Sequence, residues 1–398
     1  MDIQRQIELI SCGSAELLSA GELEEKLKRA DHARKPLRIK FGADPTHPDL
    51  HLGHTVVLRK LRTFQELGHH VVFIIGGFTA RIGDPSGESQ TRPQITRTEV
   101  DRCARTYQEQ VFKYLDRKKT EVVDNSDWLD ELKLEEVIRI AAGYTVARLV
   151  ERNDFEKRLK AKQPIGVHEF LYPLIQGYDS VRVRADVEIG GTDQKFNLLV
   201  GRELQRQAGQ EPQIVLTMPL LVGTDGHDKM SKSLGNHIGI QEPPSSMYGK
   251  IMSLSDKLTG EYADILFPAA RLFDSARPLE TKKDLARRLT EECWGGQKAL
   301  EAACEFEQVV QKKEIPGRVT EYAVPRDKVS DGKVDPVFLV TDSGGAASKS
   351  EARRLIEQGG VTLGGSRIKE SKGLIDVENG QVLKVGKRFF RRLIVKVP

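Results

Sequence analysis

The chain has 398 residues, too many for one ordinary hydrophobic core, so two or three domains are expected. Charged residues make up 30% and hydrophobic residues 38% of the sequence, and the net charge is +4, a balance typical of a globular protein and unlike that of a disordered one. No apolar run approaches the roughly 20 residues of a membrane span, and the first residues lack a signal-peptide pattern, so we expect a cytoplasmic protein without a membrane anchor.

A histidine-containing segment follows the first predicted strand. After an amphipathic helical pattern over the first 30 residues, residues 37–41 alternate apolar and polar side chains as a strand does. Residues 44–54 then read Asp-Pro-Thr-His-Pro-Asp-Leu-His-Leu-Gly-His and run into a helical pattern. The amino end of a helix offers free N–H groups and the positive end of the helix dipole, which favour an anion.

Three residues of this segment suit a phosphate. Gly53 has no Cβ to crowd a phosphate near the backbone, and His51 and His54, three apart on one helical face, could donate hydrogen bonds to it. By itself, a His-x-x-His pair is more often a surface pair or half of a metal site. The interpretation therefore depends on a second motif.

Strand and helix patterns alternate along the first part of the chain. Further strand patterns occur at residues 70–75, 120–124, 186–189 and 214–216, with helical patterns between them. This alternation predicts an α/β fold with a Rossmann-like, doubly wound parallel sheet, within a domain of residues 1–240. Ligands of such sheets bind beyond the carboxyl ends of the strands, where the strand order reverses.

Two glycine-rich turns follow strands of this sheet. The first, residues 76–87, contains Asp84 and is weak evidence of a ligand site by itself. The second, residues 190–194, reads Gly-Gly-Thr-Asp-Gln. Gly191 could let the backbone lie against a sugar, and Asp193 could accept hydrogen bonds from ribose hydroxyls, as an acidic residue does in dinucleotide-binding folds.

Three polar residues share one face of a predicted helix. Tyr172, Gln176 and Asp179 stand at positions i, i+4 and i+7. Their neighbours are apolar, which favours a largely buried helix over a solvated stripe, and buried polar groups need partners. This face is therefore a candidate binding surface.

The second motif is Lys-Met-Ser-Lys-Ser at residues 229–233, in a polar loop after an apolar run. It places two ammonium groups and two hydroxyls close together, which suits a polyanion such as a triphosphate.

The remaining sequence divides into three parts. Residues 241–325 show helical patterns and predict a small helical domain, and residues 326–334 resemble a linker. Residues 335–398 predict an α+β domain with one helix at 348–358, begun by a capping box of Ser348 and Glu351. From residue 348 onward, twelve Lys or Arg face five Asp or Glu, so the preceding residues carry −3 of the overall +4. A basic end on a slightly acidic body favours nucleic-acid binding over a merely solvated surface.

The two motifs together resemble a known signature pair. A His-Leu-Gly-His segment after a strand, followed about 175 positions later by Lys-Met-Ser-Lys-Ser, is similar to the signatures of class I aminoacyl-tRNA synthetases. The wider resemblance is to the tyrosyl-tRNA synthetase family and extends over essentially the whole chain. The basic end, around residues 348–361, is similar to the S4 RNA-binding domain.

The resemblance implies a reaction and its partners. L-tyrosine attacks the α-phosphate of Mg-ATP to give tyrosyl-adenylate and pyrophosphate, and the 3′ end of tRNA(Tyr) then accepts the tyrosine. It implies a homodimer, ATP as a substrate with Mg²⁺, no tightly bound cofactor and no metal site of the protein. The cysteines, which show no spacing typical of zinc or redox sites and are expected to be buried thiols, are Cys12, Cys103, Cys293 and Cys304.

Residue roles follow from the resemblance, position by position. The residues implied to stabilise charge on the phosphates are Thr46, His51, His54, Lys229 and Lys232. Those implied to bind tyrosine are Asp84, Tyr172, Gln176, Asp179, which would accept from the phenol, and Gln194. Those implied to bind ATP are Asp44, Gly53, Gly191, Asp193, Lys229, Ser231 and Lys232. Candidate RNA phosphate contacts are Arg353, Arg354, Arg367 and Lys369.

Two residues depart from the family pattern. Lys40 stands where many members have a tyrosine that contacts the phenol, so either its ammonium replaces that contact or Asp179 acts without it. Phe41 stands where many members have a small polar residue near the ribose.

Three alternative functions remain: a tryptophanyl-type synthetase, a nucleotidyltransferase with a similar histidine motif, and a catalytically inactive RNA-binding protein.

Overall fold

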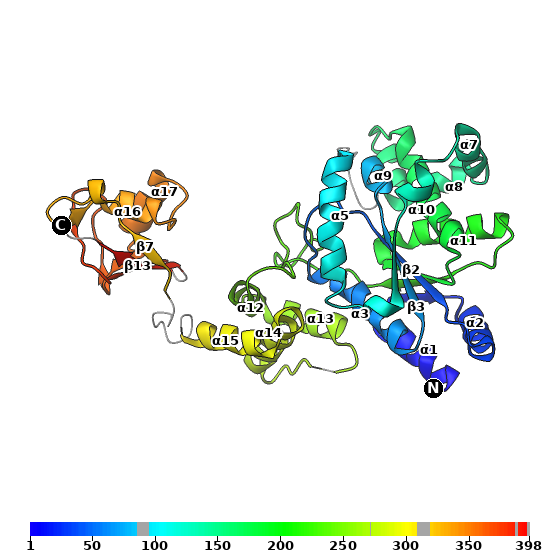
Figure 1. The fold of residues 1–398 in the computed structure, drawn as a ribbon, viewed down its shortest axis with the longest axis horizontal. Coiled ribbons are helices and arrows are strands. Elements are labelled where there is room, and N and C mark those ends of the chain that lie inside the picture. The colour runs from blue at the N-terminus through cyan, green and yellow to red at the C-terminus, as the bar shows by residue number, and fades with distance from the viewer. Residues whose placement is uncertain (86–94, 271, 309–318, 387–388, 396–398) are drawn as a thin grey trace. The chain divides into compact units, whose positions relative to one another are not determined.

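A computed structural model of the chain describes all residues except 86–94, 271, 309–318, 387–388 and 396–398 (Figure 1). The chain folds into two compact units, Met1–Cys293 and Trp294–Pro398. In the part of the chain that is described, no helix is both long and apolar enough to span a membrane.

The first unit is built on a six-stranded sheet in the order β1-β6-β5-β2-β3-β4. Its strands are β1 Glu16–Leu18, β2 Arg38–Ala43, β3 His70–Ile75, β4 Thr120–Asp124, β5 Val187–Gly191 and β6 Ile214–Met218. The five strands from β2 to β6 are parallel, which confirms the predicted doubly wound sheet. The short edge strand β1 pairs antiparallel with β6 and was missed, because it lies in a stretch that the helical pattern covered.

Helices flank this sheet, as the chain returns from strand to strand (Figure 1). The helices from the amino terminus to the last strand are α1 Ile3–Ser11, α2 Ala20–Ala33, α3 Leu52–Glu66, α4 Thr79–Ile82, α5 Arg97–Val111, η1 Arg117–Lys119, α6 Ser126–Leu129, α7 Leu134–Ala142, α8 Val146–Val150, α9 Asn153–Lys160, α10 Val167–Val183, η2 Thr192–Gln194 and α11 Lys195–Gln207. Strand β6 is buried at every position and β3 at all but its first, so both read as continuous apolar runs rather than alternating ones.

The strand order places the ligand site. From β2 the chain moves outward through β3 to β4, and then returns to form β5 on the other side of β2. The order therefore reverses between β2 and β5, and a ligand crevice is expected beyond their carboxyl ends. The histidine segment follows β2, and the Gly-Gly-Thr-Asp-Gln turn begins in the last two residues of β5.

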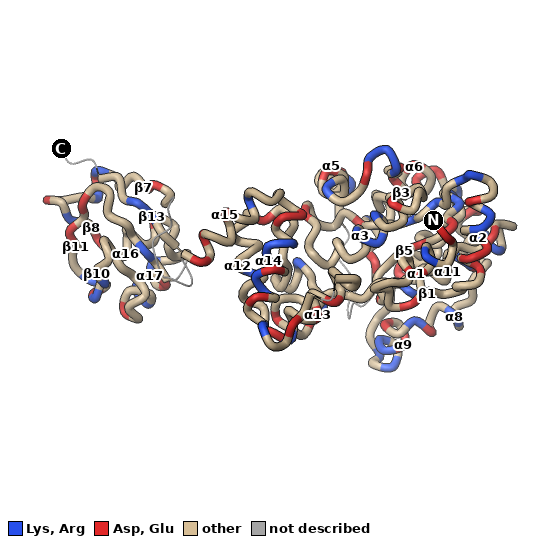
Figure 2. The backbone as a smooth tube through the Cα atoms, turned by 90° about the horizontal axis from the view of Figure 1, so that it is seen from below, with Lys and Arg blue, Asp and Glu red and all other residues tan. Residues whose placement is uncertain are grey.

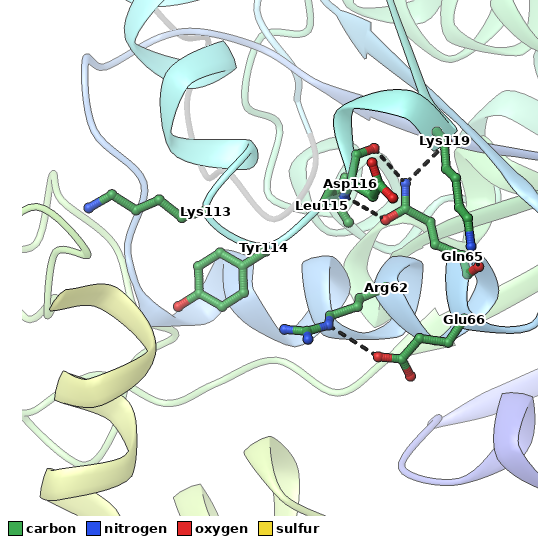
Figure 3. A pocket seen from close by; sticks show the side chains of 8 residues that line it. All are labelled: Arg62, Gln65, Glu66, Lys113, Tyr114, Leu115, Asp116 and Lys119. Carbon is green, nitrogen blue, oxygen red and sulfur yellow. Dashed lines mark hydrogen bonds and ion pairs between the residues drawn. The ribbon is translucent and has the colours of Figure 1, made fainter. Parts of the chain in front are cut away.

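Helix α3, which begins at the histidine segment, is held at its far end by a buried glutamine (Figure 3). The Gln65 amide donates to the Asp116 and Lys119 carbonyls and to the Thr120 hydroxyl, and accepts from the Asp116 N–H. These bonds join α3 to the turn before β4. The shallow pocket in Figure 3 lies at this junction and contains none of the predicted site residues.

Helices follow the last strand of the sheet. They are α12 Pro244–Met252, α13 Asp256–Leu266, α14 Pro278–Trp294 and α15 Gly296–Phe306. The first compact unit extends to Cys293, so α12 and α13 belong with the sheet and α15 with the second unit. The helical region predicted for residues 241–325 includes residues 271 and 309–318, which lie outside the described part. The domain boundary at residue 240 stays a prediction.

The second unit contains a five-stranded sheet in the order β10-β9-β12-β13-β7, and a two-stranded sheet of β11 and β8. Its elements are β7 Glu321–Ala323, η4 Arg326–Lys328, β8 Lys333–Val334, α16 Pro336–Asp342, α17 Lys349–Glu357, β9 Val361–Leu363, β10 Ser366–Arg367, β11 Ile375–Asp376, β12 Val382–Val385 and β13 Phe389–Ile394. This arrangement confirms the predicted α+β fold.

The predicted linker at residues 326–334 is instead part of this fold. Strand β7, just before it, pairs with β13, and β8, at its end, pairs with β11. Val334 is fully buried in the core of the second unit. The polar composition of the stretch misled the prediction, because these strands pair with partners distant in sequence. The folded C-terminal region therefore begins before residue 335.

Candidate active site

A cavity of about 650 Å³ opens beyond the carboxyl ends of β2 and β5. It brings together, from segments far apart in sequence, every residue predicted to contact tyrosine or ATP. These are Asp44, Thr46, His51, Gly53, His54, Asp84, Tyr172, Gln176, Asp179, Gly191, Asp193, Gln194, Lys229, Ser231 and Lys232. The cavity is therefore the candidate active site.

The two histidines are held as neutral hydrogen-bond donors. We predicted that His51 and His54 share a helical face. His51 is instead the N-cap of α3, and so it precedes the helix. Its Nδ1 accepts from the Gly53 N–H at 3.2 Å, and His54 Nδ1 accepts from the His51 N–H at 3.2 Å. A neutral imidazole that accepts at Nδ1 carries its proton at Nε2. Each ring therefore keeps an Nε2–H to donate.

Burial keeps both imidazoles uncharged at neutral pH. The ring centroids of His51 and His54 are 4.0 Å apart, so two charges there would repel each other. Burial, then the neighbouring histidines and lysines, holds the pKa of His51 far below its usual range. Burial and the Lys232 ammonium lower the pKa of His54 to about 4. The pair can therefore donate hydrogen bonds to a phosphate without titrating near neutral pH.

Two glycines of the site are required by protein packing. A Cβ at Gly53 would lie 2.9 Å from Cε1 and 3.0 Å from Nδ1 of the His51 ring. A Cβ at Gly191 would lie 2.5 Å from Asp193 Oδ1 and 2.8 Å from a Leu220 methyl. The sequence interpretation attributed both glycines to ligand approach, whereas each already has a neighbouring side chain in the space.

The lysines of the Lys-Met-Ser-Lys-Ser loop face carboxylates across the cavity. Lys229 Nζ lies 3.3 Å from Asp193 Oδ2, and Lys232 Nζ lies 3.6 Å from Asp49 Oδ2. Burial lowers the pKa of Lys232, and Asp49 opposes this shift. Asp49 belongs to the histidine segment, so the two signature motifs are in direct electrostatic contact.

Backbone hydrogen bonds also join the two motifs. The Leu52 N–H donates to the Ile238 carbonyl at 2.9 Å, and the Ile240 N–H donates to the Leu50 carbonyl at 3.0 Å. The segment after the lysine loop therefore runs beside the start of α3. This pairing brings residues separated by almost 190 positions together at one side of the cavity.

Asp179, which also lines the cavity, is buried and bonded on both oxygens. Trp128 Nε1–H donates to Oδ1 at 2.9 Å, and Asn125 Nδ2–H donates to Oδ2 at 3.1 Å. Burial raises the pKa of Asp179 to about 6, against the opposing effects of the Lys40 charge and these two donors. A carboxylate in this position can accept a further hydrogen bond through a remaining lone pair.

Tyr172 and Gln176 come from the same helix, α10, and take different partners. The Tyr172 hydroxyl donates to Asp44 Oδ2 at 2.8 Å, and Thr79 donates to Asp44 Oδ1 at 2.6 Å. Because its proton points to Asp44, the Tyr172 oxygen presents lone pairs that can accept from an ammonium. Gln176 Oε1 accepts from Asn197 Nδ2 at 2.9 Å.

Asp84 belongs to a polar chain that reaches Gln176. Gln194 donates to Asp84 Oδ2 at 2.7 Å, and its own Oε1 accepts from Asn197 at 3.0 Å. The Arg152 guanidinium lies 3.8 Å from Asp84 Oδ1 and donates to Asn197 Oδ1 at 3.2 Å. Asp84, Gln176 and Gln194, three of the residues implied to bind tyrosine, are thus connected through Asn197.

The structure places both residues that depart from the family pattern. Lys40 Nζ donates to Ser180 Oγ at 2.7 Å and to the Gln176 carbonyl at 2.9 Å, and lies 2.7 Å from Glu188 Oε1. These three partners use all three ammonium N–H groups. Lys40 therefore joins α10 to the sheet and has no donor left for a phenol. The Phe41 ring packs against Phe73 of the neighbouring strand at 5.8 Å.

The predicted RNA contacts lie in the second unit. Arg353 and Arg354 are exposed on α17, and Arg367 and Lys369 are exposed in and after β10. Figure 2 marks the Lys and Arg positions of this unit in blue. Ser348 caps α17 by accepting from the Glu351 N–H, but Glu351 accepts from Ala347 rather than from Ser348.

The sequence-based prediction did not identify several residues of the site. Asn125 immediately follows β4, so the strand-end rule could have pointed to it. Trp128, Asn197 and Arg152 had no such signal, because each acts through contacts with distant residues. Asp49 lies inside the histidine segment but was not assigned a partner there.

In the described ranges, no group of three or more His, Cys, Asp or Glu side chains is placed to hold a metal ion. Cys103 and Cys293 are buried as expected, whereas Cys12 is partly buried and Cys304 is exposed.

The fold and the paired motifs correspond to a known class of enzyme. Residues 32–311 match the family described as tRNA synthetases class I (W and Y), and residues 337–377 match the S4 domain. The first match covers more than half of the chain. The chain therefore belongs to the class I tRNA synthetases, and the cavity that contains both motifs is the candidate active site of such an enzyme.

Individual relatives narrow the family. A tyrosine–tRNA ligase of Syntrophotalea carbinolica is 50% identical over 407 residues, which cover 98% of this chain and 98% of the relative. One of Aromatoleum aromaticum is 52% identical over 405 residues, with 99% of each chain covered. The chain belongs to the tyrosine–tRNA ligase family.

Solved structures agree on the fold. A tyrosyl-tRNA synthetase from Archaeoglobus fulgidus, solved in complex with L-tyrosine, superposes with a TM-score of 0.62 at 22% identity. The similarity covers 76% of this chain and 100% of that structure.

Proposed function

We propose that this chain activates L-tyrosine with ATP to tyrosyl-adenylate and then transfers tyrosine to the 3′ end of tRNA(Tyr). One observation carries the proposal: a single cavity unites both signature motifs with the polar face of α10. The match to tyrosine–tRNA ligases over the whole chain favours tyrosine over tryptophan and over a small metabolite as substrate. The presence of all these site residues favours an enzyme over a catalytically inactive RNA-binding protein.

Charge on the phosphates would be stabilised from two sides. The Nε2–H groups of His51 and His54, together with Thr46, would donate from one wall, and the Lys229 and Lys232 ammonium groups from the other. Donors already oriented toward developing charge lower the barrier without reorganising during the reaction. The Mg²⁺ that the resemblance implies would enter bound to ATP, and its ligands would be phosphate oxygens and water.

Tyrosine would bind with its phenol at Asp179 and its ammonium group near Tyr172 and Asp84. Asp179 would accept from the phenol while Trp128 and Asn125 hold the carboxylate in place. Phenylalanine lacks that hydroxyl and would leave the carboxylate's lone pair unpaired in a buried site. Lys40 supports this recognition indirectly, through its bonds to α10 and its charge near Asp179.

The direct test is pyrophosphate exchange into ATP. Exchange that depends on L-tyrosine, and is at background with L-tryptophan or L-phenylalanine, is the expected result. Exchange that depends on tryptophan, or no exchange with any amino acid, would contradict the proposed function.

Tyrosine binding should weaken as the pH falls through the pKa of Asp179. With a pKa of about 6, the ionised fraction falls about tenfold between pH 7 and pH 5, and tyrosine affinity should fall with it. Equilibrium binding of tyrosine across this range measures the effect. The Asp179→Asn variant should bind about 10- to 150-fold more weakly at pH 7 and lose the pH dependence. A wild-type affinity that stays constant from pH 7 to pH 5 would remove Asp179 from the phenol site.

The homodimer is also part of the proposal, with one exposed apolar face as its support. Leu134 and Ile138, one turn apart on α7, are 74% and 58% exposed, and Val146, the first residue of α8, is 68% exposed. A second copy of the chain would cover these side chains. The Leu134→Asp/Ile138→Asp variant should sediment as a monomer, whereas Leu300→Asp, at a similarly exposed leucine of α15, should not change the mass. An unchanged dimer in the double variant would place the interface elsewhere.

A further inference from the structure

Asn236, three residues after the Lys-Met-Ser-Lys-Ser loop, has no role in the proposed mechanism, yet its side chain is buried and fully bonded. Its Nδ2 group donates to Asp225 Oδ2 at 2.6 Å and to the Lys229 carbonyl at 3.2 Å. Its Oδ1 accepts from the Ser231 N–H at 2.7 Å. The side chain is only 4% exposed, although it lies in a polar loop.

These bonds attach the loop to one fixed point. The amide holds the backbone on both sides of Met230, at the two residues that carry a lysine and a serine of the motif. Met230 itself is buried, and its N–H donates to the Leu221 carbonyl at 2.8 Å. The Asn236 carbonyl accepts from the Thr224 N–H at 2.8 Å, so the main chain is attached as well.

Asp225 holds the other end of this arrangement. Its Oδ1 accepts from the backbone N–H groups of His227 at 3.0 Å and Asp228 at 3.2 Å, which closes the turn before the loop. Its Oδ2 is the acceptor for Asn236. Gly223 leaves the space for this contact, because a Cβ there would overlap the Asn236 side chain.

We propose that Asn236, anchored by Asp225, is a positioning residue for adenylate formation: it sets the backbone at Lys229 and Ser231 so that the loop's ammonium groups reach the phosphates. The inference rests on the proposed function and deepens it. Asn236 is not among the residues that line the cavity, so we expect it to act through its bonds to Lys229 and Ser231 of the loop.

The expected effect lies in the rate and not in amino-acid binding. A displacement of about 1 Å in a group that stabilises the transition state can cost about 100-fold in rate. Tyrosine binds at Asp179 and Tyr172, which come from α10 and make no bond to Asn236. Asn236→Ala should therefore lower the single-turnover rate of tyrosyl-adenylate formation by about 10- to 100-fold and leave tyrosine affinity within about twofold.

A charge swap separates positioning from general damage. Asn236→Asp alone would set a second carboxylate against Asp225 and should be as slow as Asn236→Ala. In Asp225→Asn/Asn236→Asp, the new amide at 225 can donate to the new carboxylate at 236, which can still accept from Ser231. The double variant loses the bond to the Lys229 carbonyl, whose oxygen then faces a carboxylate oxygen, but it regains the bond between positions 225 and 236 and should recover about tenfold in rate over Asn236→Asp.

The control is His227→Ala, in the same turn, because the His227 side chain is exposed and only its backbone bonds Asp225. Its rate should match that of the wild type, and thermal unfolding of every variant reports whether the fold is retained. Tyrosine-dependent exchange by the wild type in the same assay tests the proposed function separately. The inference is overturned if Asn236→Ala keeps its rate, if tyrosine affinity falls as much as the rate does, or if the swap is no faster than Asn236→Asp.

Discussion

Lys229→Ala and Lys232→Ala should each lower the rate of tyrosyl-adenylate formation by about 10²- to 10³-fold, with tyrosine affinity unchanged within about twofold. Both ammonium groups line the cavity, and their carboxylate partners come from outside α10, the helix proposed to bind tyrosine. Their present partners, Asp193 and Asp49, hold them at 3.3 and 3.6 Å, distances typical of ion pairs that can exchange for phosphate oxygens.

The rate should fall without a change in tyrosine affinity because the negative charge on the phosphates develops during the reaction. Negative charge grows on the β- and γ-phosphates as the bond to the α-phosphate breaks, so interactions with those oxygens strengthen in the transition state. The groups proposed to bind tyrosine, among them Asp179 and Tyr172 of α10, are other side chains than these lysines. Single-turnover kinetics at saturating ATP, with tyrosine binding measured separately, tests the two effects.

Lys250→Ala is the matched control for Lys229→Ala. Lys250 lies after the same loop, is 37% exposed against 36% for Lys229, and is also paired with a carboxylate, that of Glu242. It does not line the cavity, so its loss should leave the rate within about twofold of the wild type. Equal losses in rate and in tyrosine affinity for the Lys229 or Lys232 variants would contradict the assignment.

Removing residues 320–398 should abolish aminoacylation of tRNA(Tyr) while sparing adenylate formation. The cut falls before β7, because the strands from β7 onward form one fold, whereas a cut at residue 335 would leave β7 and β8 without partners. The proposed tyrosine and ATP sites lie within the first unit, and the residues that line their cavity end at Ser233. Loss of several phosphate contacts should weaken tRNA binding by about 10³-fold or more.

A milder variant tests the electrostatic basis of this effect. Replacing Arg353, Arg354, Arg367 and Lys369 by alanine removes four exposed positive charges without deleting the fold. The slope of log affinity against log salt concentration should fall by about 3 to 4, since each phosphate contact contributes about 0.9. If the truncated chain charges tRNA normally, or the salt slope of the quadruple variant is unchanged, the C-terminal region has another task.

The sequence patterns located most of the site because its chemistry is local at each motif. Histidines at a helix start and a lysine loop each predict a phosphate contact, the acidic turn at residues 190–194 predicts a sugar contact, and parallel strands bring their carboxyl ends to one edge. For this reason the predicted tyrosine- and ATP-binding residues all line one cavity. The experiments above test their individual roles.

The errors have physical causes as well. Strand β1 is three residues long and is held by its pairing with β6, so its own pattern could not reveal it. The supposed linker is polar along the chain but has a buried Val334 and partners far away in sequence. His51 was assigned to a helical face, although its backbone is extended at the N-cap, a difference of one residue at a helix boundary.

The sequence by itself determined the α/β class, the two signature motifs and the basic C-terminal region, because periodicity, glycine turns and charge are properties of neighbouring residues. The resemblance that those motifs carry then supplied the individual candidate residues. Only the tertiary structure decided which groups touch. It gave Lys40 three partners and so left none of its donors for a phenol, and it placed Trp128 and Asn125 on the two oxygens of Asp179. It also attached the lysine loop to Asn236. Such contacts join residues distant in sequence, and their geometry depends on the packing of the whole unit.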